Sequence, residues 1–142
     1  MKIPEEFKKY MLKDFDFSIK KMKEEKDANR KLYFFSASFA SLERYMRYSL
    51  EPQLLLIHAV LNICYGTINN RVNAISRGDV TIEMPSDFFE RLIEYLTELR
   101  DEIAEDKDTY TTLEKFVYLS YQTTGAGYYT KNLLESSGEA IE

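Results

Sequence analysis

A long apolar segment, residues 54–75, constrains the fold more than any other part of this 142-residue chain. At about 100° per residue, the step of an α-helix, one set of apolar side chains shares a single face. This set contains Leu54, Ile57, Leu61, Cys64, Ile68, Val72 and Ile75. The first half of the segment is apolar on nearly all sides, which is typical of a buried helix. We therefore predict that this helix is the centre of the fold.

A polar stripe follows the same predicted helix beside its apolar face and supplies the ligand-pocket candidates, which are His58, Asn62, Tyr65, Asn69 and Asn73. Buried polar groups need partners, and core amides can fix the register between helices or line a cavity. We favour a structural stripe, in which a neutral His58 bonds Asn62 or a facing helix. The alternative is a binding or catalytic pocket around His58, Asn62 and Tyr65. Gly66 within the stripe predicts that another helix comes very close there, since glycine is costly in a helix interior.

Four further helices are predicted from apolar periodicity and from end signals. They cover residues 4–25, residues 28–49, a segment that starts at the N-cap Ser86, and a segment that starts at a capping box formed by Thr111 and Glu114. Pro52 and Gly78 bound the central helix, and residues 79–84 are predicted to be extended. We therefore predict an all-α, single-domain antiparallel bundle of about five helices with short loops over residues 1–135, followed by a flexible tail at 136–142.

Charge is distributed unevenly along the chain, although the net charge is only −5. Residues 1–31 carry ten Lys and Arg against seven Asp and Glu, residues 32–78 carry four against two, and residues 79–142 carry five against fifteen. We expect the acidic C-terminal helices to lie beside the basic N-terminal helix, in the same subunit or a neighbouring one. Overall acidity argues against non-specific nucleic-acid binding by the whole surface.

Several classes of function have little support in the sequence. The single cysteine excludes an internal disulfide and indicates a small core residue in a reducing compartment, so we expect a cytoplasmic protein. No run is long enough to cross a membrane. We predict no metal and no cofactor, because the aligned carboxylates Glu90, Glu94, Glu98, Glu102 and Glu105 fit a solvated helix face better than a metal shell. No catalytic motif is present, so we consider an enzyme less probable than a non-enzymatic protein.

Arginines and tyrosines give two remaining signals. Arg44 and Arg47, with Tyr33, Tyr48 and the lysines of the first helix, could form a weak nucleic-acid-binding module, which we rank third. Tyrosines near the C-terminus exceed what one buried stripe can hold, and they are interface candidates: Tyr118, Tyr121, Tyr128 and Tyr129. The preferred hypothesis is a helical protein that acts through self-association, as a homodimer, or as a component of a protein complex.

Overall fold

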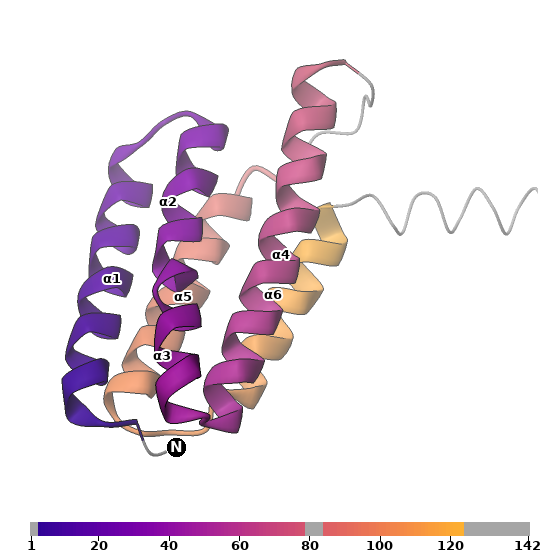
Figure 1. Ribbon diagram of the computed structural model, residues 1–142. Helices are drawn as coiled ribbons and strands as arrows, with labels where there is room; N and C mark the ends of the chain where they lie inside the picture. The colour runs from indigo at the N-terminus through magenta and orange to yellow at the C-terminus, as the bar shows by residue number, and fades with distance from the viewer. Residues whose placement is uncertain (1–2, 79–83, 124–142) are drawn as a thin grey trace, which may run out of the picture.

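The computed structural model describes residues 3–78 and 84–123. These ranges form six helical segments (Figure 1), which are α1 (Glu5–Glu24), α2 (Ala28–Ala40), α3 (Leu42–Ser49), α4 (Pro52–Ser76), α5 (Phe88–Ala104) and α6 (Tyr110–Thr123). Because α3 continues α2 after a short break, the described residues build five rods. The predicted all-α helical bundle is confirmed for the described residues. The predicted extended segment and the tail lie outside these residues, apart from Met84.

The five rods form a closed ring. α1 packs against α2, α2 against α4, α4 against α6, α6 against α5, and α5 returns to α1. Consecutive rods along the chain run in opposite directions (Figure 1). A ring with an odd number of such rods must contain at least one parallel neighbouring pair, and here that pair is α4 and α6. The other neighbouring rods are antiparallel, as predicted.

The core is filled by the apolar faces of all five rods. Four phenylalanines are almost completely buried, one each from α1, α2, α5 and α6, namely Phe15, Phe35, Phe88 and Phe116. The apolar stripe of α4 is buried as predicted from Leu54 to Val72, and only Ile75 at its end is partly exposed. Truncating a buried leucine such as Leu61 to alanine typically costs about 2–5 kcal/mol. The periodicity of the sequence therefore identified the surface that stabilises the fold.

The outer side of α4 corrects the expectation of a fully buried central helix. Leu55, Leu56 and Ile63 are exposed in the described structure. In a ring of rods every helix keeps one face toward solvent, because it contacts only the core and two neighbours. α4 is therefore apolar on nearly all sides without being buried on all of them.

Gly66 also differs from the expectation. A Cβ atom built on Gly66 meets no neighbouring atom within 4 Å. No close helix approach therefore requires glycine at this position of α4. Gly78, by contrast, follows the end of α4 with a φ of +74°, in the left-handed region that favours glycine, as its predicted capping role requires.

Some helix ends lie elsewhere than predicted. α5 begins after Asp87 rather than after Ser86. α6 begins at Tyr110, so Thr111 and Glu114 lie inside it and do not form a capping box. The amide of Tyr110 donates a hydrogen bond to the side chain of Asp108, 2.8 Å away, which satisfies one free donor at the start of this helix.

The predicted helix 28–49 is divided at Ser41. The Ser41 hydroxyl hydrogen-bonds the carboxylate of Asp14 on α1, while Ser38 bonds the carbonyl oxygen of Phe35 one turn earlier. Serine side chains that bond the backbone or a neighbouring helix compete with regular helix geometry. The break therefore occurs where Ser41 hydrogen-bonds α1.

The basic α1 and the acidic α5 lie side by side, as the charge distribution predicted. The ion pairs across this contact are specific. Arg100 on α5 holds Asp16 on α1 through two hydrogen bonds of 2.8 and 3.3 Å, and Lys8 on α1 binds Asp106 just after α5 at 2.8 Å. These pairs connect the first and the penultimate rods and close the ring on that side.

Candidate functional site: the surface between α4 and α6

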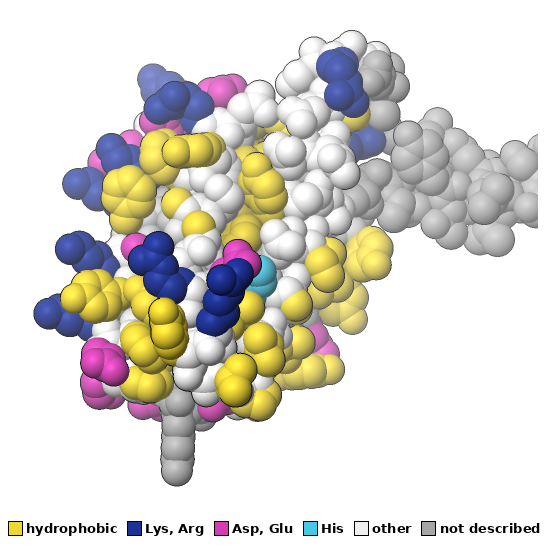
Figure 2. All heavy atoms as spheres, in the orientation of Figure 1, with side chains coloured by type: hydrophobic (Ala, Val, Ile, Leu, Met, Phe, Trp, Pro, Cys, Tyr) yellow, Lys and Arg dark blue, Asp and Glu magenta, His cyan; other side chains and the backbone are white. Residues whose placement is uncertain are grey.

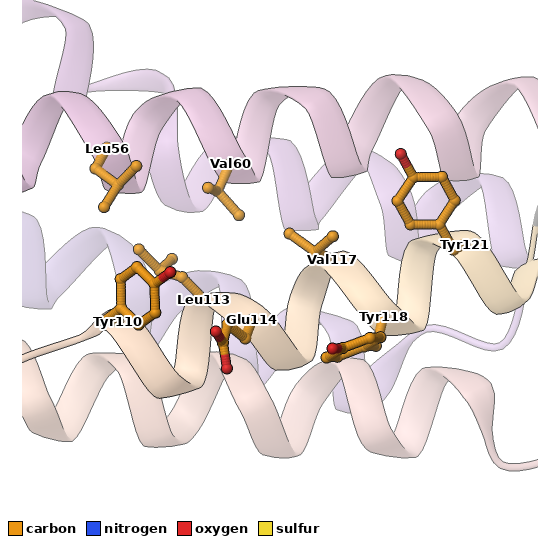
Figure 3. Close-up of a pocket in the computed structure, with 8 residues that line it drawn as sticks. All are labelled: Leu56, Val60, Tyr110, Leu113, Glu114, Val117, Tyr118 and Tyr121. Carbon is orange, nitrogen blue, oxygen red and sulfur yellow. The ribbon is translucent and has the colours of Figure 1, made fainter.

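An apolar groove follows the parallel pair α4 and α6. Its first cavity, of about 300 Å³, is lined by Leu56, Val60, Tyr110, Leu113, Glu114, Val117, Tyr118 and Tyr121. A second cavity, of about 260 Å³, continues along the same two helices and shares Val60, Val117 and Tyr121 with the first. Figure 3 shows Leu56 and Val60 directed from α4 toward α6, and the ring of Tyr121 directed toward α4.

The groove is almost free of charge. From Pro52 to Asn70, α4 contains no Asp, Glu, Lys or Arg, although part of this stretch is exposed. Glu114 is the one charged residue that lines either cavity. By comparison, the exposed positions of α5 include Glu90, Glu94 and Asp101. A helix surface depleted of charge and rich in aliphatic and aromatic side chains is typical of the centre of a protein interface.

The floor of the second cavity contains the only cysteine of the chain. The Cys64 thiol on α4 is 3.4 Å from the Ser120 hydroxyl on α6, and both residues are buried. Burial raises the pKa of the Cys64 thiol, and the hydrogen bond with Ser120 partly offsets this effect. A thiol with a raised pKa is mostly protonated near neutral pH and is a poor nucleophile. Cys64 therefore has the environment of a structural residue.

The C-terminal interface candidates divide into two groups. Tyr118 and Tyr121 on α6 are exposed and line the groove. Tyr128 and Tyr129 lie outside the described residues. The apolar spacing of this helix predicts a stripe of Leu113, Phe116, Val117 and Tyr121. Val117 and Tyr121 are exposed, however, whereas Leu119 and Ser120 are buried. The core-facing side of α6 is therefore rotated from the predicted one, toward Leu119.

The polar stripe of α4 does not line the cavities described above. His58 and Tyr65 are half-buried and both pack edge-to-face on Phe39 of α2, with ring centroids 5.9 and 6.3 Å away. Asn62 is exposed, while Asn69 and Asn73 are half-buried. Phe39 thus brings His58 and Tyr65 together on the α2 side of α4, and the asparagines continue along the helix without converging on them.

Arg44 and Arg47 are both exposed on α3. Arg47 pairs with Glu43 at 3.2 Å, and Arg44 lies between two surface hollows near Tyr10 and Tyr48. Tyr33, which the sequence grouped with them, is on α2 and lines neither hollow. Within residues 3–78 and 84–123, no group of three or more His, Cys, Asp or Glu side chains is arranged to hold a metal ion.

Sequence reasoning missed the groove, although one signal for it was present. The uncharged run of α4 was interpreted as burial, and the alternative of an exposed apolar face was not considered. No described helix is both long and apolar enough to span a lipid bilayer.

Comparison of the chain with models of protein families, with curated proteins and with solved structures gives no match.

Proposed function

We propose that the protein acts through self-association, with a second copy of the chain seated on the groove between α4 and α6. The observation that supports this proposal is an exposed apolar groove on a helix pair that carries almost no charge. A contiguous apolar patch of a few hundred Å² on a protein surface is often a site of interaction. Covering this one removes the exposed side chains of Leu56, Ile63 and Tyr118 from water.

Charge favours a second copy as the occupant. The chain has a net charge of −5, and residues 79–142 alone contribute −10, so two copies that met through α5 would place like charges together. The uncharged face of α4 and α6 is a surface that two acidic molecules can bring into contact without this repulsion. A self-complementary patch is also what a two-fold symmetric dimer requires.

The groove is large enough to form the apolar centre of an interface, but it supplies less than half of the area of an interface of ordinary size. The stretch from Leu56 to Thr67 rises about 17 Å along α4, and two adjacent helices are about 20 Å wide, which gives an apolar centre of roughly 340 Å² in projection. A standard interface buries about 800 Å² on each partner. The remaining area would come from polar residues around the groove, so we expect a dissociation constant in the micromolar range. A reducing compartment such as the cytoplasm is compatible with the buried thiol.

The test is the mass of the protein in solution, by light scattering or sedimentation at up to about 100 µM. We expect a dimer for the natural chain and a monomer for Ile63→Glu and Tyr118→Glu, because each variant places a charge in the apolar centre. Tyr33→Glu is the matched control, since Tyr33 on α2 is 66% exposed and Tyr118 is 69% exposed. A monomeric natural chain, or equal dissociation by Tyr33→Glu, would contradict the proposal.

A further inference from the structure

A second surface, separate from the groove, lies on α1 and α3 and contains two hollows on either side of Arg44. One hollow, of about 300 Å³, is lined by Glu6, Phe7, Tyr10, Arg44 and Tyr45. The other, of about 400 Å³, is lined by Ala40, Glu43, Arg44, Arg47 and Tyr48. Arg44 is thus the residue common to both. Figure 2 shows Lys and Arg side chains among hydrophobic ones over this part of the molecule.

Aromatic rings line both hollows. The ring of Phe7 stacks on that of Tyr45 with centroids 5.3 Å apart, and the Tyr48 ring lies 6.4 Å from Phe7 on a tilted plane. Tyr48 is 74% exposed, more than the other exposed large hydrophobic side chains of the described structure, and Tyr10 is 54% exposed. An exposed tyrosine ring leaves the apolar surface of its face in contact with water, and a planar group stacked on the ring removes that contact. Each hollow therefore offers one stacking platform.

The charged guanidinium of Arg44 is available to bind an anion. Arg30, Arg91 and Arg100 are paired with carboxylates at 2.8–2.9 Å, whereas no ion pair of Arg44 occurs among the described residues. Arg47 beside it is only weakly held by Glu43, and Lys13 lies three residues after Tyr10 on the same side of α1. A guanidinium without a carboxylate partner is suited to bind a phosphate through two parallel hydrogen bonds.

We propose that this surface binds single-stranded nucleic acid, with one phosphate at Arg44 and the two neighbouring bases in the hollows, stacked on Tyr10 and Tyr48. Alternation of ring, cation and ring along the surface matches the alternation of base, phosphate and base along a strand. Stacking on tyrosine with a guanidinium on the backbone is how proteins hold single strands without reading their sequence. A duplex keeps its base faces inside the stack and cannot present them to these rings.

The distribution of charge over the whole molecule determines how strongly this surface is expected to bind nucleic acid. Residues 1–78 carry a net +5 and include both α1 and α3, while the acidic remainder repels a polyanion. Binding is therefore confined to this face, weak, and reduced by salt, because few phosphates are neutralised.

Fluorescence anisotropy with a labelled oligothymidine of about ten nucleotides tests the proposal directly. At about 50 mM salt we expect binding by the natural chain, and a loss of affinity of about tenfold or more for both Arg44→Ala and Tyr48→Ala. Tyr48→Phe keeps the ring and should bind within about twofold of the natural chain. Arg30→Ala changes the net charge as Arg44→Ala does, but on α2 rather than on α3, and should also stay within about twofold.

Four results would overturn this proposal. They are absence of binding at about 200 µM protein, equal loss for Arg30→Ala, tighter binding of a duplex of the same length, and competition by thymidine monophosphate as effective per mole as the oligomer. Circular dichroism of each variant shows whether the bundle is intact. None of these variants lies in the groove between α4 and α6, so the result is independent of self-association.

Discussion

The thiol of Cys64 on α4 and the hydroxyl of Ser120 on α6 lie 3.4 Å apart, at the buried contact between the two parallel rods. This contact lies directly below the exposed groove, because Cys64 and Ser120 also line its second cavity. The buried contact that holds α4 to α6 and the surface proposed for association are thus formed by the same two helices. A substitution at this contact should change the stability of the fold and the strength of self-association together.

The raised pKa of Cys64 predicts a pH dependence of stability. A thiol whose pKa is higher in the folded than in the unfolded chain stabilises the fold below its unfolded pKa, and this contribution is lost as pH rises through the folded pKa. As pH rises above the unfolded pKa of a thiol, about 8.5, we expect the free energy of unfolding of the natural chain to fall more steeply than that of Cys64→Ala. Urea denaturation at several pH values measures this difference, and equal slopes would contradict it.

Lys8 and Asp106 provide a test of the contact that closes the ring. The hydrogen bond to Asp106 raises the pKa of Lys8, whose side chain is only 7% exposed. Asp106→Asn keeps a residue that tolerates the φ of 55° found there but removes the charge. We expect Asp106→Asn to lower the free energy of unfolding by about 1 kcal/mol near neutral pH.

The matched control for Asp106 is Glu5→Gln, since Glu5 also pairs with Lys8 but its side chain is 86% exposed. It should cost less than about 0.5 kcal/mol, because an exposed pair is screened by water. The Lys8 contribution is fully present below the unfolded pKa of lysine and disappears as pH rises through the raised folded value. An equal loss for both variants would show that Asp106 does not hold Lys8 specifically.

Gly66→Ala should stabilise the protein. The new methyl group meets no atom within 4 Å, and alanine is favoured over glycine in a helix interior by about 1 kcal/mol. Thermal and urea denaturation measure the gain. Gly78→Ala is the control with the opposite sign, because its φ of +74° is strained for alanine. Destabilisation by Gly66→Ala would mean that something in solution covers this position.

Leu50 connects α3 and α4 with a φ of 51°, in the left-handed region, and its side chain is exposed. Leucine pays about 1–2 kcal/mol for this conformation, and glycine does not. Leu50→Gly should therefore raise the free energy of unfolding by up to about 1 kcal/mol. Leu50→Val should lower it, since a β-branched residue fits the left-handed region less well. We therefore expect the denaturation midpoint to be highest for Leu50→Gly, intermediate for the natural chain and lowest for Leu50→Val.

Self-association through the groove makes thermal stability depend on concentration. The melting temperature of the natural chain should rise with protein concentration, because dimerisation stabilises the folded state and not the unfolded one. Ile63→Glu should melt at the same temperature at every concentration. A melting temperature of the natural chain that is independent of concentration would contradict the proposed dimer.

The inward faces of the helices were predictable residue by residue where the apolar spacing was regular. Leu92, Leu96 and Leu99 on α5 repeat at steps of three and four, and all are buried. On α6 the signal was ambiguous, because Phe116 and Val117 are adjacent and both fit a stripe. Packing against α5 selected Phe116 and Leu119 for the core and left Val117 in the groove.

The candidate sites were less predictable than the fold. The sequence indicated Tyr118 and Tyr121 as interface candidates, but nothing in the sequence placed them beside Leu56 and Val60. One of the two hollows at Arg44 likewise combines residues of α1 and α3 that are more than thirty positions apart, such as Tyr10 and Arg44. Local periodicity carries no information about such distant neighbours.

The sequence by itself determined that this chain is helical, roughly where most of its helices lie, and which face of most of them turns inward, because these properties depend on residues within a few positions of one another. The tertiary structure alone decided which helices are neighbours. α5 packs against α1 through pairs such as Asp16 and Arg100, and this leaves α4 beside α6 in parallel, with their uncharged outer faces forming one groove. Apolar faces of similar shape can pack in several orders, so the order is fixed only when all five rods pack together.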